Sequence, residues 1–249
     1  MAFEPRGGVP LSEPAQPAAV EVAGAAAAAG EGLPAALRVQ ILAAEHWSLL
    51  ATRSLAWNEV FTRAGMLLSA LAGAIVALAL VGQGSQFGTT FVTFGIVILP
   101  VVLFLGETTY LRMGSSNMVE AMSVIGMNRI RHAYLEIAPE LEPYFVTGSH
   151  DDPAGVGATM GVRPGANQLA HFLSATPVVV FVINGVVAGA IAGLVLVALG
   201  FGGPVAIGGS IVVFLVVVAL HVAHGRRLVA RAQAASVTRF PGSPPTPSW

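Results

Sequence analysis

Four apolar segments, grouped in two closely spaced pairs, constrain this chain more than any other feature of its sequence. They cover residues 65–81, 87–105, 177–199 and 205–222, and none contains Asp, Glu, Lys or Arg. An apolar helix of roughly 20 residues crosses the 30 Å hydrocarbon core of a bilayer. Short links, 82–86 and 200–204, join the members of each pair. The sequence therefore predicts an all-α, polytopic membrane bundle with four transmembrane helices in two hairpins.

The composition identifies the lipid bilayer as the solvent of this chain. Hydrophobic residues make up 55% of it and charged residues only 10%, whereas soluble domains carry roughly 25% charged residues. The net charge of −1 does not point to nucleic acid, so no nucleic-acid partner is expected, and the absence of cysteine excludes disulfides and thiolate metal sites. The basic residues are all arginine in an Ala-, Gly- and Val-rich chain, a composition typical of GC-rich bacterial genomes.

Shifts in composition divide the chain into five parts. Residues 1–34 are rich in Pro, Ala and Gly, which predicts a disordered arm, and they lack the features of a signal peptide. Residues 35–145 hold a helix before the membrane, the first hairpin and a helix after it. Residues 146–170 read as a loop because they are rich in Gly and Pro. The second hairpin covers 171–225, and a basic, Pro-rich tail covers 226–249.

The arginines predict the orientation of the spans. All of them lie in the N-terminal part, the central stretch or the C-terminal tail, and neither hairpin link contains one. Loops rich in arginine and lysine stay on the cytoplasmic side. We therefore expect a multi-pass protein of the bacterial cytoplasmic (inner) membrane, with both termini and the central region in the cytoplasm.

Two stretches outside the spans have the pattern of amphipathic helices. In residues 36–63 apolar and charged side chains alternate at helical spacing, which predicts a helix that lies on the membrane or on a partner helix. Residues 107–141 show similar spacing before two prolines. Ion pairs are expected among the charged residues at the membrane interface, where they would hold the hairpins together; the candidates are Glu45, Arg53, Glu59, Glu107 and Arg112.

Small residues in the third span predict close helix packing. Gly185, Gly189 and Gly193 repeat every four residues, and small residues in line allow two helix backbones to approach closely in lipid. This seam can lie within one subunit or between subunits. Asn184, beside it, is expected to form an interhelical hydrogen bond, although a polar residue inside a membrane is also a candidate functional residue.

Two further groups of residues lie at the cytoplasmic end of the fourth span and directly after it. His221 and His224 are three residues apart and share a helix face, which makes them candidate ligands of a metal or haem; interfacial histidines without a ligand are the simpler interpretation. Arg226, Arg227 and Arg231 follow, and arginines next to a membrane attract anionic lipid headgroups.

The motifs of common enzyme classes are absent from the sequence, which contains no nucleophile elbow, phosphate-binding loop, dinucleotide fingerprint or zinc-protease motif. We therefore expect a non-enzymatic, self-associating scaffold or interaction protein, without a cofactor and with a possible cytoplasmic protein partner. One alternative is a small oligomeric channel or pore-forming effector, lined by the few polar residues of the spans: Ser69, Thr89, Thr90, Thr93 and Asn184. The other is a metal- or haem-binding membrane protein.

Three short motifs carry a resemblance to known proteins. The run Gly126–Tyr134 (GMNRIRHAY), together with Glu45-His46-Trp47 and Trp57-Asn58-Glu59, is similar to a family of uncharacterised bacterial integral membrane proteins. The likeness covers residues 38–152 and implies no established activity. The order of helix, two close spans and returning helix also resembles, more distantly, the two-span SLATT effector domains. This resemblance implies that the chain would disrupt membranes.

Overall fold

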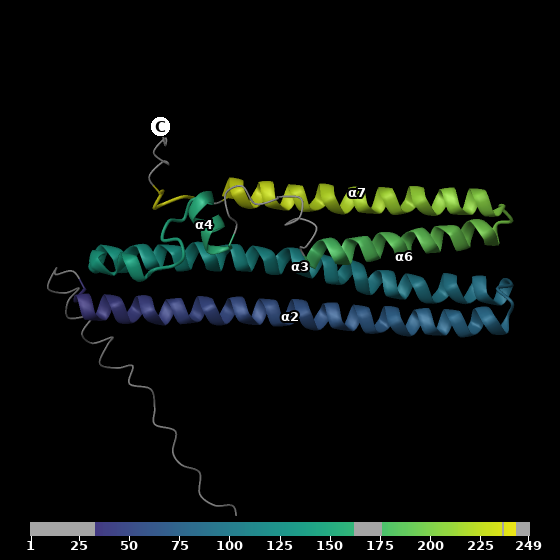
Figure 1. Cartoon of the computed structure of the whole chain (residues 1–249), viewed down its shortest axis with the longest axis horizontal. Coiled ribbons are helices and arrows are strands. Elements are labelled where there is room, and N and C mark those ends of the chain that lie inside the picture. The colour runs from purple at the N-terminus through teal and green to yellow at the C-terminus, as the bar shows by residue number, and fades with distance from the viewer. Residues whose placement is uncertain (1–32, 162–175, 236, 243–249) are drawn as a thin grey trace, which may run out of the picture. The chain divides into compact units, whose positions relative to one another are not determined.

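The computed structural model describes residues 33–161, 176–235 and 237–242 (Figure 1). The predicted arm, residues 1–34, lies almost entirely outside this part of the chain. The chain divides into two units, Met1–Trp47 and Ser48–Trp249. The described part of the first unit is the beginning of helix α2 (Ala35–Gly84). All packing described below belongs to the second unit.

The first hairpin consists of α2 and α3 (Thr89–Ile137), which are 50 and 49 residues long. Each is about 75 Å in length at 1.5 Å per residue, well over twice the thickness of the hydrocarbon core. The turn between them places Gln86 and Phe87 in the left-handed region, at φ 51° and 55°. The helices predicted before and after the first pair of spans are therefore continuations of the spans, and α3 runs on through Pro100.

The second hairpin consists of α6 (Thr176–Ala198) and α7 (Gly203–Ala235). Gly200 has φ 85° in the turn between them, a conformation that favours glycine. Because α7 continues to Ala235, the first ten residues of the basic tail predicted over 226–249 belong to a helix.

Two short helices interrupt the loop between the hairpins. A 3-10 helix, η1 (Pro139–Tyr144), follows α3, and α4 (Pro153–Thr159) follows it. The carboxylate of Asp152 accepts a hydrogen bond from the backbone N–H of Gly155 at 2.7 Å and so caps α4. The loop predicted over 146–170 is therefore wrong for the seven residues of α4.

The prediction of an all-α membrane bundle is confirmed for the described residues. They contain no strand, and four helices are long and apolar enough to cross a membrane: α2, α3, α6 and α7. Many large apolar side chains on these helices are exposed, among them Leu80, Val97, Phe104 and Leu220. In a bilayer such side chains face lipid, so the protein is a multi-pass membrane protein.

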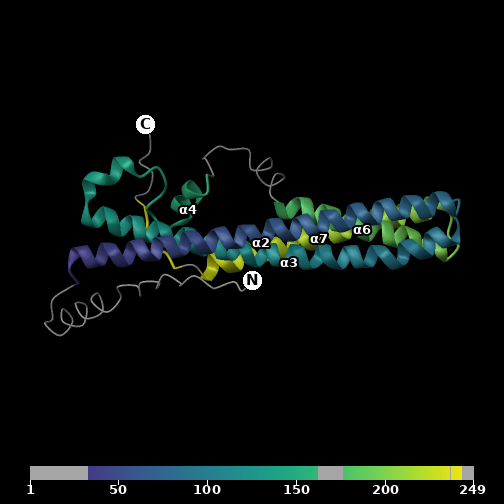
Figure 2. The same cartoon turned by 90° about the horizontal axis from the view of Figure 1, so that it is seen from below.

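Both hairpin turns lie at one end of the bundle (Figures 1 and 2). The described arginines of the second unit lie in α2 before residue 64, in α3 after residue 106, in the last ten residues of α7 and at position 239. We call the end of the spans nearest these arginines the polar end. There α2 and α3 extend beyond the spans as a paired section, residues 48–63 and 107–137, which we call the stalk.

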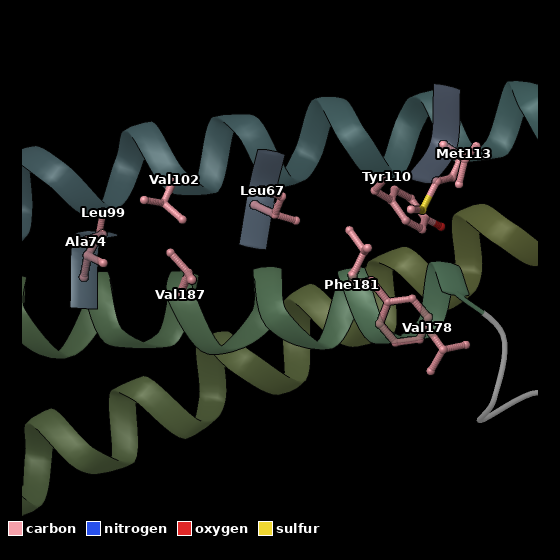
Figure 3. Close-up of a cluster of buried hydrophobic side chains, with 11 residues drawn as sticks. Leu67, Ala74, Leu99, Val102, Tyr110, Met113, Val178, Phe181 and Val187 are labelled. Atoms are coloured by element: carbon pink, nitrogen blue, oxygen red, sulfur yellow. The ribbon is translucent and has the colours of Figure 1, made fainter. Parts of the chain in front are cut away.

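The buried core joins α2, α3 and α6 (Figure 3). Leu67 and Met113 are each only 1% exposed, and Tyr110 of α3 and Phe181 of α6 point toward one another with ring centroids 6.3 Å apart. Val218 and Val222 of α7 pack against this core. The core therefore runs from mid-membrane to the polar end, where the polar residues of the bundle gather.

Candidate functional site

Asn184 of α6 lies against Gly106 of α3, where the two helices are in close contact. Its side chain is 1% exposed, and a Cβ atom added at Gly106 would overlap its amide oxygen. Gly106 of α3 therefore makes room for the amide, which faces a neighbouring helix rather than a polar passage. The amide nitrogen is buried without a hydrogen-bond partner in the structure. The interhelical hydrogen bond predicted for Asn184 is thus absent for this nitrogen.

The three glycines of the predicted seam all face α7 of the same chain. A Cβ atom at Gly185 would lie 3.0 Å from the ring of Phe214, and one at Gly189 would lie 2.7 Å from the carbonyl oxygen of Ser210. At Gly193 it would overlap the hydroxyl of Ser210. The seam therefore holds the second hairpin together, and its glycine face is covered by α7.

A cluster of hydrogen bonds and ring contacts connects the two hairpins at the polar end. Its members are Glu107 and Tyr110 of α3, Phe181 of α6 and His221 of α7. The hydroxyl of Tyr110 donates to the carbonyl oxygen of His221 at 2.8 Å, and the Tyr110 and His221 rings are 4.3 Å apart. Nε2 of His221 lies 3.1 Å from the carboxyl of Glu107. Ion pairing between the hairpins was expected, but its histidine partner was not.

The hydrogen bonds of His221 define where its protons lie. Nδ1 is 2.8 Å from the carbonyl oxygen of Val217, which can only accept, so Nδ1 carries a proton. Nε2 faces the carboxyl of Glu107, so polar groups of the two hairpins satisfy one another beside the hydrocarbon, where an unpaired polar group is costly.

These contacts bear on the prediction that His221 and His224 are ligands of a metal or haem. Both ring nitrogens of His221 face oxygen atoms of the protein, and His224 has its ring centroid 6.1 Å from that of Tyr110. In the described ranges, no group of three or more His, Cys, Asp and Glu residues is arranged to hold a metal ion. The geometry gives His221 a structural role between the hairpins.

A cavity of about 910 Å³ opens beside this cluster. It lies between α3 and α7, and the first turn of α6, with Pro177 and Val178, borders it. Because α6 begins at Thr176 while α3 and α7 continue, the cavity occupies the space beyond the end of α6. His221, His224 and Arg226 line it together with mainly apolar side chains.

The three arginines predicted to contact lipid headgroups lie on the last turns of α7 and are exposed. Within the described residues, no carboxylate is within ion-pair distance of Arg226, Arg227 or Arg231. Of these three arginines, Arg226 alone lines the cavity, a difference that the sequence did not suggest.

Ion pairs hold the two helices of the stalk together. Arg53 donates to the carboxylate of Glu120 at 2.8 Å, and Glu59 accepts from both Arg112 of α3 and Arg63 of its own helix. Hydrogen bonds from Arg112 and then Arg63 hold the pKa of Glu59 below its ordinary value. Residues 48–63 therefore pair with a partner helix, the second of the two arrangements predicted for this stretch.

Residues 239–242 are anchored to the loop before α4, through contacts that we call the C-terminal anchor. The side chain of Asp151 is 0% exposed. It accepts hydrogen bonds from the backbone N–H groups of Arg239 and Phe240, at 2.9 and 2.8 Å, and from the guanidinium of Arg129 at 2.8 Å. Asp152 accepts from the backbone N–H of Gly242 at 2.7 Å.

A second set of polar residues, on α3 and the loop after it, supports the anchor. Asn128 of α3 is 0% exposed; its amide donates to the carbonyl oxygen of His150 and accepts from Arg131 and Thr159. The ring of His132 lies 4.4 Å from that of Phe240. Much of the GMNRIRHAY run thus supports the anchor: Asn128, Arg129, Arg131 and His132.

Sequence reasoning missed this anchor. Its signals in the sequence are weak: an acidic pair before Pro153, typical of a helix N-cap, and a polar run in a helix otherwise facing a core. Nothing in the spacing of Asp151 and Phe240, 89 residues apart, indicates that they meet.

The C-terminal anchor should open in acid. Burial raises the pKa of Asp151, but the backbone N–H groups of Arg239 and Phe240 and the guanidinium of Arg129 outweigh it, so the pKa lies below the ordinary 3.8. A carboxylate with a lowered pKa stabilises the fold above its unfolded pKa, and this contribution is lost as the pH falls through the folded value. We expect the anchor to stay closed from neutral pH to about pH 4 and to open below it.

The absence of cysteine makes this measurement direct. A spin label at an introduced Thr238→Cys should be immobile at pH 7 and become mobile below about pH 4. A label at Val229→Cys, on α7, is the control and should not change over that range. Mobility at position 238 that is already high at pH 7 would contradict the anchor.

Comparison with known proteins adds no family to this picture, since no family model, curated protein or solved structure matches the chain.

Proposed function

We propose that this chain is a non-enzymatic, self-associating scaffold of the bacterial cytoplasmic membrane, with the stalk and the C-terminal anchor in the cytoplasm. One observation carries the proposal: the stalk is an extension of two helices, joined by ion pairs, that keeps apolar side chains exposed outside the predicted spans. At 1.5 Å per residue, residues 107–137 reach about 46 Å beyond the membrane. An extension of this length is suited to protein contacts rather than to chemistry on lipid.

The exposed apolar residues of the stalk support self-association. Leu111, Val119 and Met122 are 57%, 38% and 65% exposed and follow one side of α3, while Leu55 of α2 is 69% exposed. Outside a bilayer such residues gain by burial, at roughly 25 cal/mol per Å² of apolar surface. The glycine seam does not supply this interface, because α7 covers it.

Substitution of the exposed stalk residues should lower the subunit number. We expect the full chain in lipid nanodiscs to give a discrete oligomer by native mass measurement, and the double variant Leu55→Glu, Met122→Glu to give monomers. Introduced carboxylates at an apolar interface would have to be desolvated without a partner. The double variant Ser54→Glu, Ser115→Glu places the same two charges on exposed polar positions of α2 and α3 and is the matched control. A strict monomer for the unaltered chain would contradict the proposal.

A pore-forming effector is the second candidate, and the exposed hydroxyl residues of the first hairpin favour it. Ser69, Thr89, Thr90 and Thr93 are exposed on α2 and α3, so several copies would have to combine to line a path. Asn184 no longer belongs to this set because its side chain is buried. Ion flux through reconstituted liposomes separates the candidates, since a scaffold that inserts correctly leaves the liposomes impermeable.

A further inference from the structure

The cavity beyond the end of α6 is independent of the stalk surface on which the proposed scaffold depends. Its volume, about 910 Å³, lies within the range of ligand pockets, roughly 300–1,000 Å³. It extends from the polar end of the spans, at Phe181, to the last turns of α7, at Ala232. Its position at the boundary of the bilayer makes it accessible to molecules that partition into the membrane.

The walls of the cavity are mainly apolar. Met118 and Ala121 of α3, Val178 and Phe181 of α6 and Leu228 of α7 form much of its lining. The polar cluster beside it is already internally satisfied, because the hydroxyl of Tyr110 donates to His221 and the ring nitrogens of His221 face Val217 and Glu107. A ligand that fills most of this space must therefore be apolar.

Among the described lining residues, formal charge comes from Arg226 and is positive. No Asp or Glu is among them, and His224 and Asn117 add an imidazole and an amide. Arg226 has no carboxylate within ion-pair distance in the described ranges. The first turn of α6 adds the partial positive charge of a helix N-terminus. The cavity is therefore complementary to an anion at its polar side.

From these observations we propose that the cavity binds an anionic amphiphile, with an acyl chain between α3 and α7 and a carboxylate or phosphate at Arg226 and His224. A neutral lipid would leave the guanidinium without a counter-ion, and a free anion would leave the apolar walls unfilled. Two sources have this chemistry: an anionic phospholipid of the bilayer and a free fatty acid.

Native mass spectrometry of the full chain tests the proposal. The chain is reconstituted in phosphatidylcholine nanodiscs that contain either phosphatidylglycerol or oleate as a minor component, and the amphiphile retained on release is measured. We expect one anionic amphiphile per chain, and its identity shows which source is used. Equal retention of phosphatidylcholine, or retention of neither anion, would overturn the proposal.

Variants of the charged lining show whether the retained molecule occupies the cavity. In the Arg226→Gln, His224→Gln double variant, retention should fall about tenfold, since basic residues at a membrane surface contribute to the binding of anionic lipid. Arg239→Gln removes the same charge at a position outside the cavity and should leave retention unchanged. Retention that instead depends on Arg227 and Arg231 would place the anion on the outer surface of α7 and overturn the assignment.

The place of the acyl chain is tested separately from that of the head group. A fatty acid or phospholipid with a photoreactive group on its acyl chain should label the chain at Met118 or Leu228, as peptide mapping would show. Ala121→Trp, which places an indole in the cavity wall and occupies part of the space, should reduce this labelling while circular dichroism confirms an unchanged helix content. Labelling confined to the lipid-facing sides of the spans would contradict the proposal.

Discussion

Gly189→Leu is expected to destabilise the second hairpin by about 3 kcal/mol, the upper end of the usual cost of overpacking. The Cβ atom alone would lie 2.7 Å from the carbonyl oxygen of Ser210. That oxygen belongs to the backbone of α7, so it moves only if the two helices separate. SDS titration in mixed micelles, followed by circular dichroism, measures the change in the free energy of unfolding.

Gly208→Leu is the matched control for this experiment. Gly208 lies in the same hairpin, and a Cβ atom there meets nothing within 4 Å. Because leucine has a higher helix propensity than glycine, by roughly 0.5–1 kcal/mol, this variant should be neutral or slightly more stable. Equal effects of the two variants, or a loss of subunit association without a loss of stability at Gly189, would show that the seam acts between subunits.

The positions of the spans could be predicted from the sequence because lipid imposes the requirement locally. A run of about 20 residues without charge is sufficient to predict a transmembrane helix, and the third predicted span, residues 177–199, differs from α6 by one residue at each end. The four-residue spacing of the glycines predicted a packing seam for the same reason. Its partner was left open, because any helix can use such a face.

The continuity of α2 and α3 was not predictable in the same way. Residues 48–63 and 107–137 have charged side chains at helical spacing, which suits a surface helix as well as a stalk. The choice depends on pairing between helices that are far apart in sequence, such as Arg53 with Glu120. Such pairs follow from the register of α2 against α3, which no local pattern defines.

The cavity and the cluster beside it also depend on tertiary structure. The sequence made the histidines candidate metal ligands. The role of His221 follows instead from the carbonyl oxygen of Val217 and the carboxyl of Glu107, which contact its two ring nitrogens. The cavity exists because α6 begins where α3 and α7 continue. A space of this kind depends on where one helix begins relative to two others, and hydropathy along the chain does not indicate it.

The largest effect outside the membrane is expected for Asp151→Asn, which should release the C-terminal anchor. The carboxylate is fully buried and accepts from two backbone N–H groups and the guanidinium of Arg129. The side-chain NH2 of asparagine is a donor, so at least one of these three N–H donors loses its acceptor. The buried charge pair with Arg129 is also broken. Breaking a buried pair costs about 3–5 kcal/mol, and we expect about 3 because Arg129 remains partly solvated.

Trypsin reports this release directly, because its cleavage site after Arg239 lies inside the anchored segment. If the free energy that holds the segment closed falls by about 3 kcal/mol, the rate of cleavage after Arg239 rises by about 100-fold, provided that the segment opens and closes faster than it is cut. Cleavage after Arg231 in the same digest is the internal reference, since α7 extends past it to Ala235. Glu142→Gln, which alters an exposed carboxylate in η1, should change neither rate. If Asp151→Asn leaves the cleavage after Arg239 as slow as in the unaltered chain, contacts other than the carboxylate hold the segment, and the ring of His132 against Phe240 is the first to test.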